Sequence, residues 1–246
     1  MHKDSFDVWS PQLRNRRSVD VYLPDSYDAT RRRYPVVYMQ DGQNLSDPAI
    51  AFAGQTWNLR EGMEWLAGRG IEPIVVGIHN TPARLAEYSP VVDARHGGGD
   101  GEKYARFLID TLKPRIDTSY RTRRDRDATV IAGSSMGGLI ALYVYFRRPS
   151  PFGRAAVMSP SLWFGGRAVL DIVRQARQTR GRIWLDVGTS EGTATLKNAR
   201  LLNRVLRRKG YRKDTLRFVE AEGHQHREAD WAWRLPQALE FLLREG

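Results

Sequence analysis

The chain has 246 residues, of which 41% are apolar and 27% charged, as is usual for a globular protein. This length predicts one domain, residues 1–246, with a well-buried core. No apolar run approaches the roughly 18 residues of a membrane span, and the absence of cysteine excludes disulfides and thiol catalysis. No signal peptide is visible at the start, so we expect a cytoplasmic protein or a mature form that has lost its leader.

The formal net charge is +11, which raises the question of nucleic-acid binding. The arginines, however, occur in short scattered groups, and none alternates with aromatic residues as a base-stacking surface would. We therefore expect a solvated basic surface, or a field that attracts anionic substrates, and no nucleic-acid partner.

Short apolar segments recur along the chain and are typical of β-strands. Several are continuous runs rich in β-branched residues, which fit strands covered on both faces, as in a parallel sheet. The predicted strands are Asp7–Trp9, Ser18–Leu23, Val36–Met39, Ile74–Gly77, Ala128–Ala132, Ala155–Met158, Ile183–Val187 and Leu216–Val219.

Helical patterns lie between these strands. One apolar face comprises Tyr104, Phe107, Leu108 and Leu112, and another comprises Leu196, Ala199, Leu202, Val205 and Leu206. For the second helix we expect Thr193 as the cap and Gly210 as the stop. Pro236 either kinks the last helix or marks its start. The alternation predicts an α/β fold, with a mostly parallel sheet of about eight strands and helices on both faces.

The segment Gly133–Gly138, GSSMGG, follows one of the predicted strands and precedes a helix. This is the pattern G-x-S-x-G, in which a sharp strand-to-helix turn exposes the central serine, here Ser135. Gly133 and Gly137 supply the small residues that such a turn needs. The helix that follows points its N-terminus at the serine, which favours developing negative charge. Ser135 is therefore the candidate nucleophile.

A serine nucleophile needs a base, and the base needs a carboxylate that orients it, in the chain order Ser, acid, His. Glu191 lies just beyond the strand RIWLDV, where it can reach toward the serine. Asp186 is the alternative, but it lies inside the strand. Both His224 and His226 lie in the loop after the last strand. A catalytic zinc would need three ligands, and no further histidine cluster exists, so we expect no metal and no cofactor.

Two backbone N–H groups are expected to stabilise an oxyanion. The first belongs to Met136, directly after the serine. The second comes from the loop MQDGQNL after the third strand, where Gln43 is the candidate donor and Gly42 the alternative. Asp41 or Asn44 could hold that loop in shape.

Several segments together resemble the esterase D-like family of α/β-hydrolases, which includes feruloyl esterases, trilactone siderophore esterases and mycolyltransferases. The similarity covers nearly the whole chain. It is carried by YPVVYMQDGQNL, RLAEYSP, GGGD, DTSYRT, IAGSSMGGLIALY, MSPSLWF, DVGTSEG and EGHQHREADW.

The resemblance implies an α/β-hydrolase fold and distinguishes the two histidines. Similar family members read G-x-x-H-x-E-x-x-W before the last helix, and Gly223, His226, Glu228 and Trp231 match this spacing. His226 is thus the expected base and His224 the second choice. The family's acid aligns at Glu191.

The expected protein is a serine esterase that acts on a small-molecule ester through an acyl-enzyme. The substrate class that the resemblance implies is an aryl, feruloyl or siderophore-type ester. An acyltransferase with the same residues and a non-catalytic binding domain are the alternatives. Trp163 and Phe164 follow the end of a predicted strand, where they either line an acyl or aryl pocket or pack in the core. Arg84 either binds an anionic substrate group or pairs with Glu87 or another acid to brace its loop.

Overall fold

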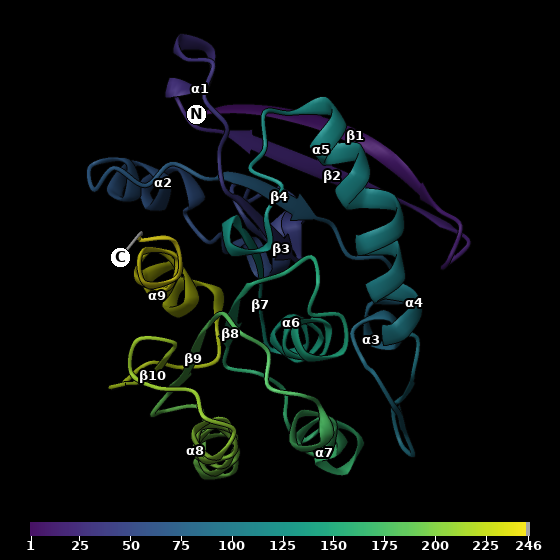
Figure 1. Ribbon diagram of the computed structural model, residues 1–246. Coiled ribbons are helices and arrows are strands. Elements are labelled where there is room, and N and C mark those ends of the chain that lie inside the picture. Colours follow the sequence, from purple (N-terminus) through teal and green to yellow (C-terminus); the bar gives the residue numbers. More distant parts are fainter. Residues whose placement is uncertain (245–246) are drawn as a thin grey trace.

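The computed structural model describes residues 1–244 and is built around one eight-stranded sheet (Figure 1). The strand order is β1-β2-β4-β3-β7-β8-β9-β10. Strand β2 pairs antiparallel with β1 and β4, whereas the six strands from β4 to β10 in this order are parallel. The strands are β1 (His2–Ser10), β2 (Asn15–Leu23), β3 (Val36–Gln40), β4 (Ile74–Ile78), β7 (Thr129–Ser134), β8 (Arg154–Met158), β9 (Arg182–Gly188) and β10 (Leu216–Ala221). The predicted mostly parallel sheet is confirmed.

Helices cover both faces of the sheet. One face packs against α2 (Leu59–Ala67) and α9 (Glu228–Leu243). The other packs against α4 (Gly101–Arg106), α5 (Lys113–Ser119), α6 (Met136–Arg147), α7 (Ala168–Gln175) and α8 (Thr193–Arg208). A π-helical segment, Phe107–Leu112, joins α4 to α5. Short elements complete the fold: α1 (Ser26–Ala29), α3 (Arg84–Glu87) and the hairpin of β5 (Val92–Asp93) and β6 (Gly97–Gly98). Within residues 1–244, no helix has the length and apolar character to cross a membrane.

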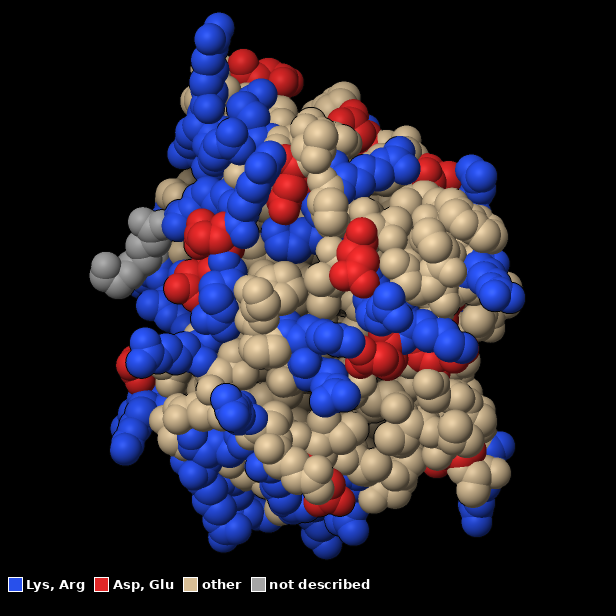
Figure 2. Space-filling view, turned by 45° about the vertical axis from the view of Figure 1, so that its right-hand side comes forward, with Lys and Arg blue, Asp and Glu red and all other residues tan. Residues whose placement is uncertain are grey.

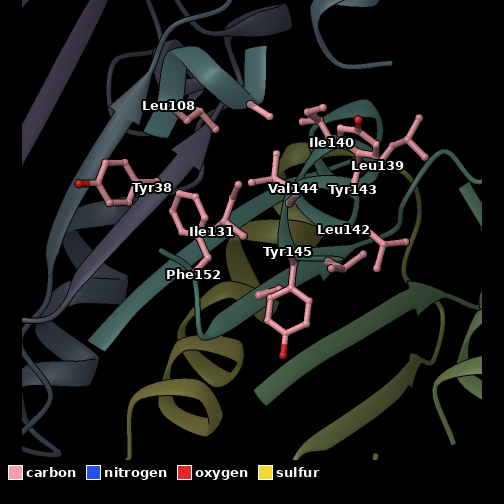
Figure 3. Close-up of a cluster of buried hydrophobic side chains, with 14 of the residues drawn as sticks. Tyr38, Leu108, Ile131, Leu139, Ile140, Leu142, Tyr143, Val144, Tyr145 and Phe152 are labelled. Atoms are coloured by element: carbon pink, nitrogen blue, oxygen red, sulfur yellow. The ribbon is translucent and has the colours of Figure 1, made fainter. Parts of the chain in front are cut away.

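Helix α6 lies at the centre of the larger core cluster (Figure 3). Every residue from Met136 to Phe146 is buried, so the helix is covered on all sides. Beside it, the rings of Tyr38 and Phe152 meet edge to face with centroids 5.7 Å apart. Because close-packed interiors resist deformation, this burial gives the turn before α6 a rigid base.

One helix end differs from the sequence pattern. The N-cap of α8 is Gly192 and not Thr193, which is the first helical residue; no side chain caps this end. The expected stop is confirmed, since Gly210 adopts a φ of 96° just after the last turn. Pro236 lies inside α9, which runs from Glu228 through Leu243, so it does not mark the start of that helix.

Candidate active site

Ser135 occupies the sharp turn between β7 and α6, at the carboxyl edge of the parallel strands. Its backbone is strained, with φ of 56° and ψ of −122°. The two flanking glycines allow the turn to close: a Cβ on Gly133 would lie 2.6 Å from the backbone of Gly137, and one on Gly137 would lie 3.0 Å from Cβ of Gln40. The strain and the close packing together hold the serine oxygen at the crevice.

His226 is the histidine that reaches this serine. Its Nε2 lies 2.9 Å from Oγ of Ser135, and its Nδ1 lies 2.7 Å from Oε2 of Glu191. The ring packs edge-on against Trp231, with centroids 4.9 Å apart. His224 instead lies against Trp233, and its Nδ1 is 3.6 Å from Asp230. In residues 1–244, no three His, Asp or Glu side chains are grouped to hold a metal ion.

Glu191 is the carboxylate that contacts the histidine, and its side chain is fully buried. Its Oε1 accepts hydrogen bonds from the backbone N–H of Gly188, at 2.7 Å, and from the hydroxyl of Ser159. Burial by itself would raise the pKa of Glu191, but the hydrogen bonds from His226, Ser159 and Gly188 outweigh it and lower that pKa. The carboxylate is therefore held in its ionised form beside the imidazole.

Asp186, the alternative acid, is also fully buried, but its carboxylate is hydrogen-bonded to groups other than His226. It accepts hydrogen bonds from Arg234, at 2.9 Å, and from the indole of Trp184, at 2.7 Å. Burial raises its pKa to about 6, although the charge of Arg234 opposes this. Asp186 thus belongs to the supporting layer behind Glu191.

Backbone contacts join the acid loop to the histidine loop. The N–H of Ser190 donates to the carbonyl of His224 at 3.0 Å, and the N–H of Gly223 donates to the hydroxyl of Thr189 at 2.9 Å. Gly188 is needed here, because a Cβ on it would lie 2.2 Å from the His224 carbonyl oxygen. These contacts fix the separation of Glu191 and His226.

The two expected oxyanion donors lie at the start of α6 and in the pocket lining in front of the serine. Met136 is the first residue of α6, where the N–H groups have no partner within the helix. Gln43 lies in the tight turn Gly42–Asn44 after β3 and lines the pocket in front of Ser135. A Cβ on Gly42 would lie 2.3 Å from the backbone of Gly77, so Gly42 serves to press this turn onto β4. Gln43 stays our candidate for the second donor, with Gly42 the alternative.

A pocket of about 470 Å³ opens in front of Ser135 and His226. Its outer wall includes Ile50 and Phe52, from the segment between β3 and α2. The two side chains are 50% and 71% exposed, so they present apolar surface at the pocket. The pocket therefore has an apolar rim available to a ligand.

Trp163 is not among the residues that line this pocket. It is half exposed and packs against the rings of His96 and Phe164, with centroids 5.4 and 5.6 Å away. Phe164 is buried in the core. Trp163 and Phe164 thus lie beside the β5–β6 hairpin, and neither lines the pocket in front of Ser135.

Arg84 does line the pocket, and its partner is Asp41 and not Glu87. Its Nε and Nη2 each donate to the Asp41 carboxylate at 2.7 Å. Burial would lower the pKa of Arg84, but the bond to Asp41 raises it, so the guanidinium stays charged. Glu87 pairs instead with the buried Arg17, at 2.8 Å. The charge of Arg84 is thus largely balanced within the protein.

Four residues of the site escaped the sequence patterns. Ile50 and Phe52 lie in a segment without periodicity, and Ser159 lies in a turn after β8. Arg234 reads as an exposed residue of an amphipathic helix but is fully buried. Its position three residues after Trp231 places both on one side of α9, and that spacing was the only available signal.

The fold and the site define an α/β-hydrolase with a serine turn at the carboxyl edge of its sheet. The model of the family described as "Putative esterase" matches residues 10–242, so the chain belongs to this family. It is a carboxylic ester hydrolase.

Similar proteins extend this comparison. The chain is 27% identical to the uncharacterized protein YbbA of Bacillus subtilis, over 93% of this chain and 92% of that protein. It is 28% identical to an endo-1,4-beta-xylanase/feruloyl esterase of Xylanibacter ruminicola, over 61% of this chain and 20% of the relative. The solved enterobactin esterase FES of Shigella flexneri shares the fold, with a TM-score of 0.81 and 22% identity, over 98% of this chain and 58% of that one.

Proposed function

We propose that the protein is a serine esterase in which Ser135 is the nucleophile, His226 the base and Glu191 the orienting acid. One observation carries this proposal: a continuous hydrogen-bonded path runs from Ser135 Oγ through the imidazole of His226 to Glu191. A neutral imidazole that donates from Nδ1 to a carboxylate presents an unprotonated Nε2 to the serine. That is the tautomer a general base needs.

The reaction proceeds in two halves. Ser135 Oγ attacks the ester carbonyl carbon while its proton passes to Nε2 of His226, and the N–H groups of Met136 and Gln43 stabilise the oxyanion. The imidazolium then protonates the leaving alcohol, and the acyl group remains on the serine. Water, deprotonated by His226, attacks this acyl-enzyme, and the serine leaves with its proton restored.

The pocket favours an uncharged ester with an apolar or aromatic group. Phe52 and Ile50 offer apolar surface, whereas Arg84, paired with Asp41, has little charge left for a substrate anion. Burial raises the pKa of Glu228, and the charge of the nearby Asp41 adds to this, so the pocket already holds two neighbouring acidic groups. Feruloyl esters fit this description, and the relative named as a feruloyl esterase supports testing them.

A fluorophosphonate probe with mass mapping tests the assignment. We expect labelling at Ser135 only, and no p-nitrophenyl ester hydrolysis by Ser135→Ala. An unlabelled Ser135, or an active Ser135→Ala protein, contradicts the proposal. A panel of short acyl, feruloyl and catecholate trilactone esters then ranks substrates. Product analysis with added acceptor alcohols separates hydrolysis from acyl transfer.

A further inference from the structure

Ser159 lies directly behind the candidate acid, in the turn after β8. Its side chain is fully buried, and its φ of 39° is in the left-handed region that a non-glycine residue seldom adopts. Its backbone N–H donates to the carbonyl of Asp186 at 3.0 Å. The strained backbone is thus anchored to β9, and it aims the hydroxyl at Glu191.

The partners of this hydroxyl determine which way its hydrogen points. Trp231 Nε1 lies 3.1 Å from Ser159 Oγ, and Arg234 Nη2 lies 3.2 Å from it. Indole and guanidinium groups can only donate, so they occupy the two lone pairs of the serine oxygen. The single hydroxyl hydrogen is left for the remaining partner, Oε1 of Glu191.

The two oxygens of the Glu191 carboxylate consequently have different partners. Its Oε1 accepts hydrogen bonds from the hydroxyl of Ser159 and the N–H of Gly188. The distance from Oε1 to Arg234 Nη2 is 3.5 Å. Its Oε2 is left for Nδ1 of His226. A carboxylate that was free to rotate would present either oxygen at varying distance, and the imidazole would lose its fixed tautomer.

We propose that Ser159 and Arg234 are positioning residues for the reaction: together with Trp231 they fix the hydroxyl of Ser159 as a donor that holds Glu191 toward His226. The proposal rests on the proposed function, since it assigns the groups that act through Glu191. Arg234 also pairs with Asp186, so its guanidinium links both buried acids to α9, the helix that follows His226.

Steady-state kinetics on the full chain test this. Ser159→Gly removes the hydroxyl and suits the positive φ, so the backbone strain is relieved at the same time. With p-nitrophenyl acetate we expect kcat to fall roughly ten- to hundredfold, as for the loss of a hydrogen bond to a charged group, with KM nearly unchanged. We also expect the acidic limb of the kcat/KM profile, which follows the general base, to move, because the carboxylate of Glu191 that orients this base loses a hydrogen bond.

Ser10→Ala is the matched control, because Ser10 is an equally buried serine at the end of β1. It should retain the kcat and the pH profile of the parent. A folded Ser159→Gly protein with the parent kcat and an unmoved acidic limb overturns the proposal. If Ser159→Gly does not fold, Trp231→Phe replaces it, since it keeps a ring beside His226 and removes one donor to Ser159. An unmoved acidic limb in Trp231→Phe would likewise overturn the proposal.

Ser135→Ala, measured in the same assay, separates the two proposals. An active Ser135→Ala protein contradicts the serine mechanism itself. An inactive Ser135→Ala protein beside an unaffected Ser159→Gly protein contradicts only the positioning role.

Discussion

The guanidinium of Arg84 holds the carboxylate of Asp41 through two hydrogen bonds of 2.7 Å each, and the pair forms one wall of the pocket in front of Ser135. Asp41 has a φ of 57° and precedes the turn that contains Gln43. Because a bidentate arginine–carboxylate pair fixes both orientation and distance, the pair sets the shape of this turn.

Replacing Arg84 shows whether this residue maintains the shape of the turn that contains Gln43 or binds an anionic group of the substrate. We expect Arg84→Gln to lower kcat/KM for neutral and for carboxylate-bearing esters by the same factor, since the turn with Gln43 loosens for both. The measurement is kcat/KM for a matched pair of esters that differ only in one carboxylate. A loss confined to the charged ester would instead identify Arg84 as an anion-binding residue. Asp41→Asn, which weakens the same pair from the other side, is the control.

The two neighbouring histidines should differ sharply. His226→Ala removes the group that contacts Ser135 and is expected to reduce kcat by roughly 10⁴-fold. His224→Ala removes a ring that lies against Trp233, so activity should stay close to that of the parent. Hydrolysis of a p-nitrophenyl ester by both variants provides the comparison. The reverse order of effects would refute the assignment of the base.

The apolar rim should contribute to binding and not to the chemical step. Phe52→Ala is expected to raise KM severalfold for an aromatic acyl ester, with kcat little changed, because exposed ring surface is lost from the pocket. A short acyl ester should be affected less. Trp9→Ala is the control, since Trp9 is a half-exposed aromatic residue on β1 and does not line this pocket. Equal KM changes for both esters would argue against a role for Phe52.

Gly42 is predicted to be essential for packing. Gly42→Ala places a Cβ 2.3 Å from the Gly77 backbone, so it should lower the free energy of unfolding by about 3 kcal/mol. Gly70→Ala, whose φ of 74° is strained for alanine but whose Cβ meets nothing within 4 Å, should cost only about 1 kcal/mol. Urea unfolding of both variants measures the difference. Equal losses would show that contact with Gly77 is not the cause.

Asp186 should make stability depend on acid pH. Its pKa in the folded protein is raised to about 6, above the ordinary 3.8, so the folded state binds the proton more tightly than the unfolded state. The free energy of unfolding contributed by Asp186 therefore falls as pH rises from about 3.8 to about 6. Asp186→Asn should remove this part of the slope, whatever its effect on absolute stability. Urea unfolding at several pH values, for parent and variant, provides the test.

Local sequence determined the framework of this protein. Short β-branched runs predict the strands of the sheet, because both faces of a parallel strand are buried and apolar periodicity disappears. The stretch Gly133–Gly138 predicts the serine turn, since its closure needs small residues at fixed spacing from Ser135. Family resemblance added the choice of His226, which no local property distinguishes from His224.

Tertiary packing decided what surrounds these residues. The partner of Arg84 is Asp41, which lies 43 residues away, and the groups behind Glu191 come from the turn after β8, from β9 and from α9. A buried arginine such as Arg234 has the same sequence signature as an exposed one. Its burial depends on which carboxylates the fold brings to it, because only a compensated charge can leave water. Sequence thus determined where the candidate nucleophile lies, and the assembled fold determined which groups surround its proposed partners.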